Sequence, residues 1–197
     1  MILIAGDSFT AETKFPIWHD HLIKHSQKKL NVARHGVGNI FIADTIKTVL
    51  DHNRIKACLV IWSDMDRLDK VESKVKAKMY TGSSGKIWNH YGNMVSGEAK
   101  ADWKSLGYDN VVAMNEKAID DTHNLIEQLK IPYVYSFIND SDLIPERLKV
   151  DAVKPFIGDY AVEKQMLEDD NYHANAEAHK KWSDLVRTKI EIMEIIS

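Results

Sequence analysis

The sequence predicts an α/β protein built on a mostly parallel sheet, and two observations support this. Four short apolar runs rich in β-branched and aromatic residues are typical of buried strands, and each ends near Gly, Asp or Asn. Between them lie segments whose apolar residues recur at helical spacing. Strands joined by helical crossovers form a parallel sheet with both faces covered, and ligands bind outside the carboxyl ends of such strands.

The expected elements alternate as strand, helix, strand, helix and strand, followed by an irregular stretch, a helix, a strand and a last helix. The strands are expected at Ile2–Ala5, Leu30–Ala33, Ala57–Trp62 and Tyr133–Ile138. The helical patterns run from Phe15 to Ile23, from Phe41 to Leu50, from Val111 to Leu129 and from Trp182 to Met193. The irregular stretch, 66–109, carries glycines among aromatic residues, and we interpret it as a loop-rich insertion beside the active end or a plain surface excursion.

Length and composition indicate one ordinary globular domain. A chain of 197 residues buries roughly two-thirds or more of its unfolded surface without disulfides or metal. The net charge of −3 gives no electrostatic footprint for nucleic acid or an anionic membrane. The single cysteine, Cys58, lies in an apolar run and is expected to be a buried small hydrophobe. With no basic stretch followed by an apolar run at the start, we expect a cytoplasmic protein.

Ser8 follows the first expected strand directly, in Gly6-Asp7-Ser8, and is either a nucleophile or a polar residue of a turn. A serine hydroxyl needs a base to take its proton, usually a histidine oriented by a carboxylate. His173 fits that role, because it precedes the last helix and Asp170 stands three residues before it, close enough in a turn to reach its Nδ1–H. His21 and His25 are four apart and could share a metal, but no third ligand is near, so we predict no metal site and no cofactor.

A developing oxyanion needs hydrogen-bond donors, and backbone N–H groups near glycine supply them. Gly36, Gly38 and Asn39 follow the second strand and precede a helix, so their N–H groups are expected at the same sheet edge as Ser8. The glycines could equally make a plain strand-to-helix turn.

The ordered set Gly6-Asp7-Ser8, Asn31…Gly36…Asn39 and Asp170-x-x-His173 resembles blocks I, II and V of the SGNH (GDSL-like) hydrolases over nearly the whole chain. The resemblance implies a three-layer α/β/α sandwich with a central, mostly parallel sheet, the flavodoxin-like fold of that family. It implies Ser8 as nucleophile, His173 as general base and then acid, and Asp170 as the orienting carboxylate. The N–H groups of Ser8 and Gly36 would be two oxyanion donors.

The third block departs from the family pattern of Gly-x-Asn-Asp, whose Asn supplies a third oxyanion donor. Asp64 takes the nearest position in Trp62-Ser-Asp-Met-Asp-Arg67, and a carboxylate repels an oxyanion. Candidates to complete the hole are therefore Asn39, Ser63 or Arg67, beside Asp64 itself. This block and the second resemble those of divergent SGNH-like proteins that bacteriophages encode, which would place the protein in the host cytoplasm or a virion.

Two functions remain open at this point. The first is a serine ester hydrolase of the esterase, lipase or carbohydrate deacetylase type, with a small-molecule or carbohydrate ester as its partner and no nucleic acid or membrane. The second is an SGNH-fold binding or assembly protein with weak or no catalysis, favoured by the missing Asn and by the acidic run from Asp64 to Asp69. Such a run could bind a divalent cation, although the spacing favours a solvated charged loop. A nucleotide-binding protein is less favoured, since no phosphate-binding glycine pattern follows the first strand.

Overall fold

The computed structural model describes residues 1–24, 26–69, 87–88, 105–170 and 173–191. A central sheet of four parallel strands has the order β2-β1-β3-β6. Its strands are β1 (Ile2–Gly6), β2 (Lys29–Asn31), β3 (Ala57–Trp62) and β6 (Tyr133–Phe137). The predicted α/β class and its parallel sheet are therefore confirmed.

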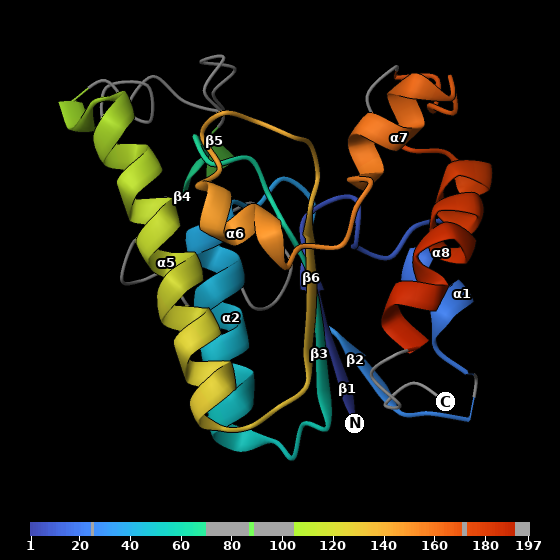
Figure 1. Ribbon diagram of the computed structural model, residues 1–197, viewed down its shortest axis with the longest axis horizontal. Helices are drawn as coiled ribbons and strands as arrows, with labels where there is room; N and C mark the ends of the chain where they lie inside the picture. The colour runs from blue at the N-terminus through green and yellow to red at the C-terminus, as the bar shows by residue number, and fades with distance from the viewer. Residues whose placement is uncertain (25, 70–86, 89–104, 171–172, 192–197) are drawn as a thin grey trace.

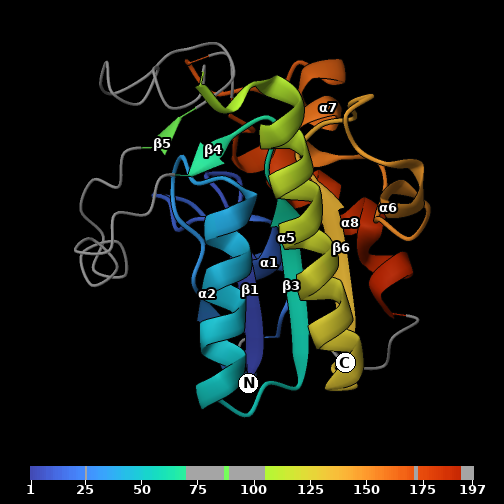
Figure 2. The same ribbon diagram turned by 90° about the vertical axis from the view of Figure 1, so that its left-hand side faces the viewer.

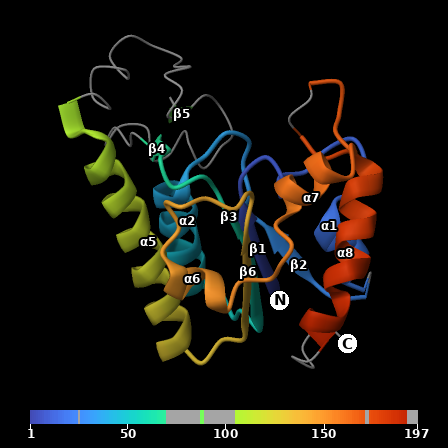
Figure 3. The same cartoon turned by 45° about the horizontal axis from the view of Figure 1, so that its top comes forward.

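Helices cover both faces of this sheet. On one face lie α2 (Asn39–His52) and α5 (Tyr108–Gln128), and on the other lie α1 (Trp18–Leu22), α7 (Ile157–Glu163) and α8 (Ala176–Glu191) (Figure 1). Figure 2 looks onto the first face, where α2 and α5 run side by side in front of the strands. Figure 3 brings the carboxyl ends of the strands forward and shows the same two groups of helices on either side of them.

The core follows from the alternation of side chains along β1 and β3. Leu3 and Val60 point to the α2/α5 face, whereas Ile4 and Leu59 point to the α1/α8 face, and all four are buried. Because these strands are buried on both sides, their sequences read as continuous apolar runs. The rings of Trp18 and Trp182 pack edge to face, with their centroids 5.7 Å apart, and hold α1 against α8.

The topology opens a crevice where the chain changes direction. From β1 the chain passes through α1 to β2 on one side, and then through α2 to β3 on the other side of β1. In an open α/β sheet, such a switch point leaves a crevice at the carboxyl ends of the strands, where ligands bind. Ser8 follows β1 at this position.

The predicted helices α2, α5 and α8 each begin earlier than their apolar patterns, and two further elements differ in their bounds for local reasons. The first helix starts at Trp18 rather than near Phe15, because Thr13 Oγ1 accepts a hydrogen bond from Phe15 N and Phe15 precedes a proline, which disfavours helical backbone. The second strand ends at Asn31 rather than Ala33, because the Asn31 side chain accepts a hydrogen bond from Ala33 N and turns the chain.

Four short elements were not predicted. The helices α6 (Glu146–Val150) and α7 are too short to produce a clear periodic pattern. Within the predicted insertion, β4 (Leu68–Asp69) pairs antiparallel with β5 (Ile87–Trp88), and α5 begins already at Tyr108. The rest of the predicted insertion, 70–86 and 89–104, lies outside the described residues, as does the last part of the final helical pattern beyond Glu191.

The interpretation of Asp64 to Asp69 as a solvated charged loop is wrong. Asp66, Arg67 and Asp69 are only 4%, 6% and 7% exposed. The Asp69 carboxylate accepts hydrogen bonds from Gly38 N and Phe41 N at 2.8 Å each, and so satisfies the first turn of α2. These charges are buried because each has a partner inside the protein.

Candidate active site

Ser8 is presented by a tight turn at the end of β1. The backbone N–H groups of Thr10 and Ala11 both donate to Asp7 O, and Phe9 N donates to the Asp7 carboxylate at 3.0 Å. Gly6, where the turn begins, has φ +155°, and a Cβ there would lie 2.5 Å from Thr10 Oγ1 and 2.9 Å from Ile61 O. The glycine is therefore required for the chain to leave the strand this sharply and expose one face of Ser8.

His173 is held by a closed loop that precedes α8. Glu168 N donates to His173 O at 2.7 Å, and Leu167 pairs with Ala174 across the base of this loop. Asp170 Oδ1 accepts a hydrogen bond from His173 N at 3.0 Å, while its Oδ2 lies 2.5 Å from His173 Nδ1. One carboxylate thus fixes both the backbone and the ring of His173.

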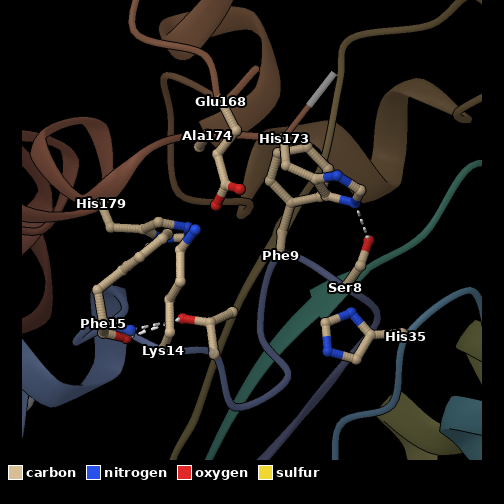
Figure 4. Close-up of a pocket in the computed structure, with 10 residues that line it drawn as sticks. Ser8, Phe9, Lys14, Phe15, His35, Glu168, His173, Ala174 and His179 are labelled. Atoms are coloured by element: carbon tan, nitrogen blue, oxygen red, sulfur yellow. Dashed lines mark hydrogen bonds between the residues drawn. The ribbon is translucent and has the colours of Figure 1, made fainter. Parts of the chain in front are cut away.

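The structure brings Ser8, His173 and Asp170 together. Ser8 Oγ lies 2.9 Å from His173 Nε2, across 165 positions of sequence (Figure 4). A carboxylate only accepts hydrogen bonds, so the imidazole proton lies on Nδ1 and Nε2 is left to accept the proton of the serine hydroxyl. The ring of Phe9 lies 5.5 Å from the imidazole ring and packs on it. This geometry can activate a serine hydroxyl as a nucleophile.

Gly36 lies in a loop that is joined to the end of β1. Arg34 N donates to Gly6 O at 3.2 Å, which brings the loop after β2 to the strand that carries Ser8. Gly36 itself has φ +70°, a conformation that favours glycine. The loop that carries Gly36 therefore lies at the same sheet edge as Ser8, and the role of its N–H as an oxyanion donor stays a prediction.

The four candidates for a third oxyanion donor have different environments. Asn39 is fully buried, and its amide clamps the chain after β3: Oδ1 accepts from Ser63 N at 2.7 Å, and Nδ2 donates to Ser63 O and Asp64 O. Both Asn39 amide hydrogens are thus occupied. Ser63 is 2% exposed, and its Oγ has no hydrogen-bond partner among the described residues. It lines a cavity together with Asp64 and Asn139 that does not include Ser8.

Arg67 and Asp64 belong to a buried ionic network instead. Arg67 Nη1 donates to Asp7 Oδ2 at 3.1 Å and to Val37 O at 3.2 Å, and its Nη2 lies 3.5 Å from Asp64 Oδ2. Burial raises the pKa of Asp7, which is fully enclosed, and the guanidinium beside it acts in the opposite direction. The guanidinium is therefore engaged with the residue before Ser8, and the predicted direct role of Arg67 as an oxyanion donor is not favoured.

A cavity of about 280 Å³ opens at Ser8 and His173. Phe9, Phe15 and Ala174 supply apolar wall, and Lys14 and Glu168 add charges of opposite sign (Figure 4). His179 also lines it, and burial lowers the pKa of this histidine to about 3, so its ring is uncharged near neutral pH. The cavity can therefore hold a small, largely neutral organic group against the serine.

The remaining predictions concern metals, thiols and membranes. Among the described residues, no group of three or more His, Cys, Asp or Glu side chains could hold a metal ion, and His25 of the considered His21/His25 pair lies outside them. Cys58 is completely buried in β3, and burial raises the pKa of its thiol to about 12. No helix in the described part of the chain is both long enough and apolar enough to cross a bilayer.

Sequence reasoning missed the residues that line the cavity, among them Glu168 and His179, and two residues that support the site. Asp7 joins the turn under Ser8 to Arg67, and the signal for it was a carboxylate placed directly after a buried strand. Asn115, in the middle of α5, donates to Arg67 O at 2.8 Å, and its only sequence signal was a polar residue on the apolar face of a helix.

Neither a family model nor a curated protein matches the chain.

Proposed function

We propose that this protein is a serine ester hydrolase of the SGNH (GDSL-like) type, a divergent member resembling those of bacteriophages. The observation that carries the proposal is the chain of contacts from Ser8 Oγ to His173 Nε2 and from His173 Nδ1 to Asp170, at 2.9 and 2.5 Å. The crevice at the switch point of the parallel sheet and the order of the three motifs along the chain support it.

The reaction would follow the route of serine hydrolases. His173 Nε2 takes the proton of Ser8 as the oxygen attacks the ester carbonyl, and the resulting imidazolium is stabilised by Asp170. The N–H groups of Ser8 and Gly36 would donate to the oxyanion, with the Ser63 hydroxyl as a third candidate. His173 then gives its proton to the leaving alcohol. In the second half it takes a proton from the water that attacks the acyl carbonyl and returns it to Ser8 Oγ as the bond to the acid breaks.

The cavity favours a short substrate over a long-chain lipid. About 280 Å³ is near the lower end of the range of roughly 300–1,000 Å³ for pockets that hold drug-sized molecules. Its walls mix aromatic rings with Lys14 and Glu168, which suits a small acyl ester or an acetylated sugar whose hydroxyl groups need hydrogen-bond partners. The esterase and carbohydrate deacetylase activities are thus favoured over the lipase activity.

The direct test is covalent labelling with a fluorophosphonate probe, together with hydrolysis of p-nitrophenyl acetate. The wild type is expected to gain the mass of the phosphonyl group on the peptide that contains Ser8 and to hydrolyse the ester. Ser8→Ala should abolish both, and His173→Ala should slow both by about a thousandfold or more. Equal ester turnover by wild type and Ser8→Ala would rule the proposal out.

A binding or assembly protein that keeps the fold without catalysis is the second candidate. The observation that favours it is Asp64, an acidic residue at the nearest position to the family's oxyanion-stabilising Asn. The same labelling experiment separates the two functions, because a non-catalytic protein with this geometry would leave the probe unreacted at neutral pH. Rapid, Ser8-specific labelling would exclude this second candidate.

A further inference from the structure

The guanidinium of Arg67 touches three chain segments that meet at the candidate active site. It donates to Asp7 Oδ2 after β1 and to Val37 O after β2, and it pairs with Asp64 after β3. Each of these segments follows a neighbouring strand of the parallel sheet. One side chain therefore ties together the carboxyl ends of three strands.

We propose that Arg67 is the positioning residue of the oxyanion hole, holding the Ser8 turn and the Gly36 loop in register through Asp7 and Val37. The proposal rests on the hydrolase function proposed above. It gives Arg67 a role that differs from direct donation to the oxyanion, because the guanidinium acts through the backbone groups of its neighbours.

The connection to Ser8 runs through the two oxygens of Asp7. Oδ1 accepts the hydrogen bond from Phe9 N that shapes the turn around Ser8, and Oδ2 binds Arg67 Nη1. Asp7 is completely buried, and Arg67 is its cationic partner among the described contacts. Without Arg67 the Asp7 carboxylate would be an unpaired buried charge, and no cation would hold its orientation. The direction of the Ser8 N–H thus depends on this ion pair.

The connection to Gly36 runs through the next residue along the chain. Val37 O accepts from the same Nη1 that binds Asp7, so the two loops share one donor atom. Val37 O lies in the peptide unit between Val37 and Gly38, two units after the one that carries the Gly36 N–H, so fixing this carbonyl restrains the loop that carries the proposed second donor. A displacement of about 1 Å in such a group can cost roughly a hundredfold in rate.

Arg67 is itself anchored from the outer helix layer. Asn115 of α5 is fully buried and donates from Nδ2 to Arg67 O and to Val111 O, both at 2.8 Å. Arg67 is 6% exposed, so its side chain is confined by packing as well as by hydrogen bonds. An arginine is suited to this position because its planar fork can address several acceptors at once, whereas a lysine ammonium is a compact charge on a flexible stem.

The test uses Arg67→Lys and Arg67→Ala in the full-length protein. Arg67→Lys keeps the charge but cannot bridge the three segments, so we expect kcat for p-nitrophenyl acetate to fall by about ten- to a hundredfold with KM changed by less than about threefold. The rate of Ser8 labelling by the fluorophosphonate should fall by a similar factor. In Arg67→Ala, added guanidinium chloride at millimolar concentration should restore part of the lost kcat.

Arg147→Ala is the matched control, since Arg147 also contacts two carboxylates, Glu116 and Asp120, but is half exposed on the surface. Its kcat should equal that of the wild type, with or without guanidinium. Because the Arg67 variants could fail to fold, Asn115→Ala provides a second probe: it removes the donor to Arg67 O at 2.8 Å without changing a charge or adding a donor near Ser8, and it should lower kcat by about two- to tenfold.

The outcomes separate this inference from the proposed function. Ser8-dependent turnover with full kcat in Arg67→Lys would overturn the positioning role and leave the hydrolase intact. If Arg67→Lys does not fold, full kcat in Asn115→Ala would overturn it instead. Turnover that is independent of Ser8 would overturn both proposals. The role of Arg67 is supported if Arg67→Lys loses kcat at constant KM, and if guanidinium restores part of kcat in Arg67→Ala but has no effect on Arg147→Ala.

Discussion

At the scale of single residues, the type of a residue does not by itself assign its role, because the role depends on the atoms that its side chain contacts. Asn39 and Arg67 were both candidates for direct stabilisation of an oxyanion, yet Asn39 binds the backbone of Ser63 and Asp64, and Arg67 binds Asp7. Asp170 is the opposite case. It is half exposed, and both of its carboxylate oxygens contact His173.

This geometry leads to a prediction for Asp170→Asn. The change removes the charge that stabilises the imidazolium, so kcat/KM should fall by about ten- to a thousandfold. The free energy of unfolding should change by less than about 1 kcal/mol, because exposed ion pairs contribute little. Steady-state kinetics and urea unfolding measure the two effects. Asp169 is an exposed neighbour of Asp170, and Asp169→Asn is the control that should leave both values unchanged. Equal kinetics in the two variants would contradict the role of Asp170 as the carboxylate that orients His173.

At the scale of elements, the site is built from strand ends and helix starts. The turn after β1 presents Ser8, and the loop before α8 presents His173. Asn175 stands between that loop and the helix. Its Oδ1 caps α8 by accepting from Ala178 N at 3.0 Å, and its backbone N–H donates to Met166 O at the base of the loop. The position of the histidine therefore depends on the start of the helix.

Asn175→Ala should reduce both stability and rate. Loss of the cap should lower the free energy of unfolding by about 1 kcal/mol. The loosened loop should lower kcat by several-fold while KM stays nearly constant, since His173 lies two residues before the cap. Asn53→Ala is a suitable comparison: the Asn53 side chain donates to Val49 O at the exposed end of α2. That variant should lose little stability and no activity, and a matching loss of kcat there would argue against the specific role of Asn175.

At the scale of the whole molecule, two neutral histidines lie on opposite faces of the sheet, His179 buried and His123 half-buried. Burial lowers the pKa of His179, on α8, to about 3 and that of His123, on α5, to about 4. His123 packs against Tyr133 and Tyr135 of β6, at ring distances of 4.9 and 4.5 Å. An unfolded histidine has a pKa of about 6.5. Below that pH the unfolded chain binds more protons than the folded one, so stability falls as the pH falls.

Between pH 7.5 and 5.5, each of these histidines should cost the protein about 1 kcal/mol of stability. Urea unfolding at the two pH values measures this change. His179→Gln and His123→Gln should each remove about half of the pH-dependent loss, whereas His52→Gln, at an exposed position, should remove none. An unchanged loss in both the His179 and the His123 variants would contradict the prediction. Burial raises the pKa of Asp7 and Asp69, and protonation of these carboxyls acts in the opposite sense, so the share of each histidine is taken from the difference between its variant and the wild type.

Much of the fold could be predicted because its signals are local. The strands β1, β3 and β6 and the helices α2, α5 and α8 each bury a continuous run or a periodic stripe of apolar residues, and both patterns are visible in the chain. The short helices α6 and α7 and the two-residue strand β4 are too brief to leave such a pattern. The charges of residues 66–69 were misjudged because polarity in a sequence does not reveal whether a buried partner exists.

The sequence by itself determined the α/β class, the position of Ser8 at the end of the first strand and the pairing of Asp170 with His173, since each depends on residues close together in the chain. Only the tertiary structure decided that Ser8 and His173 lie 2.9 Å apart, and that Arg67 reaches Asp7 and Val37 rather than the reacting atoms. The physical reason is that these contacts join separate strand ends. Their distances are set by the order, register and twist of the sheet and by the packing of helices on both its faces.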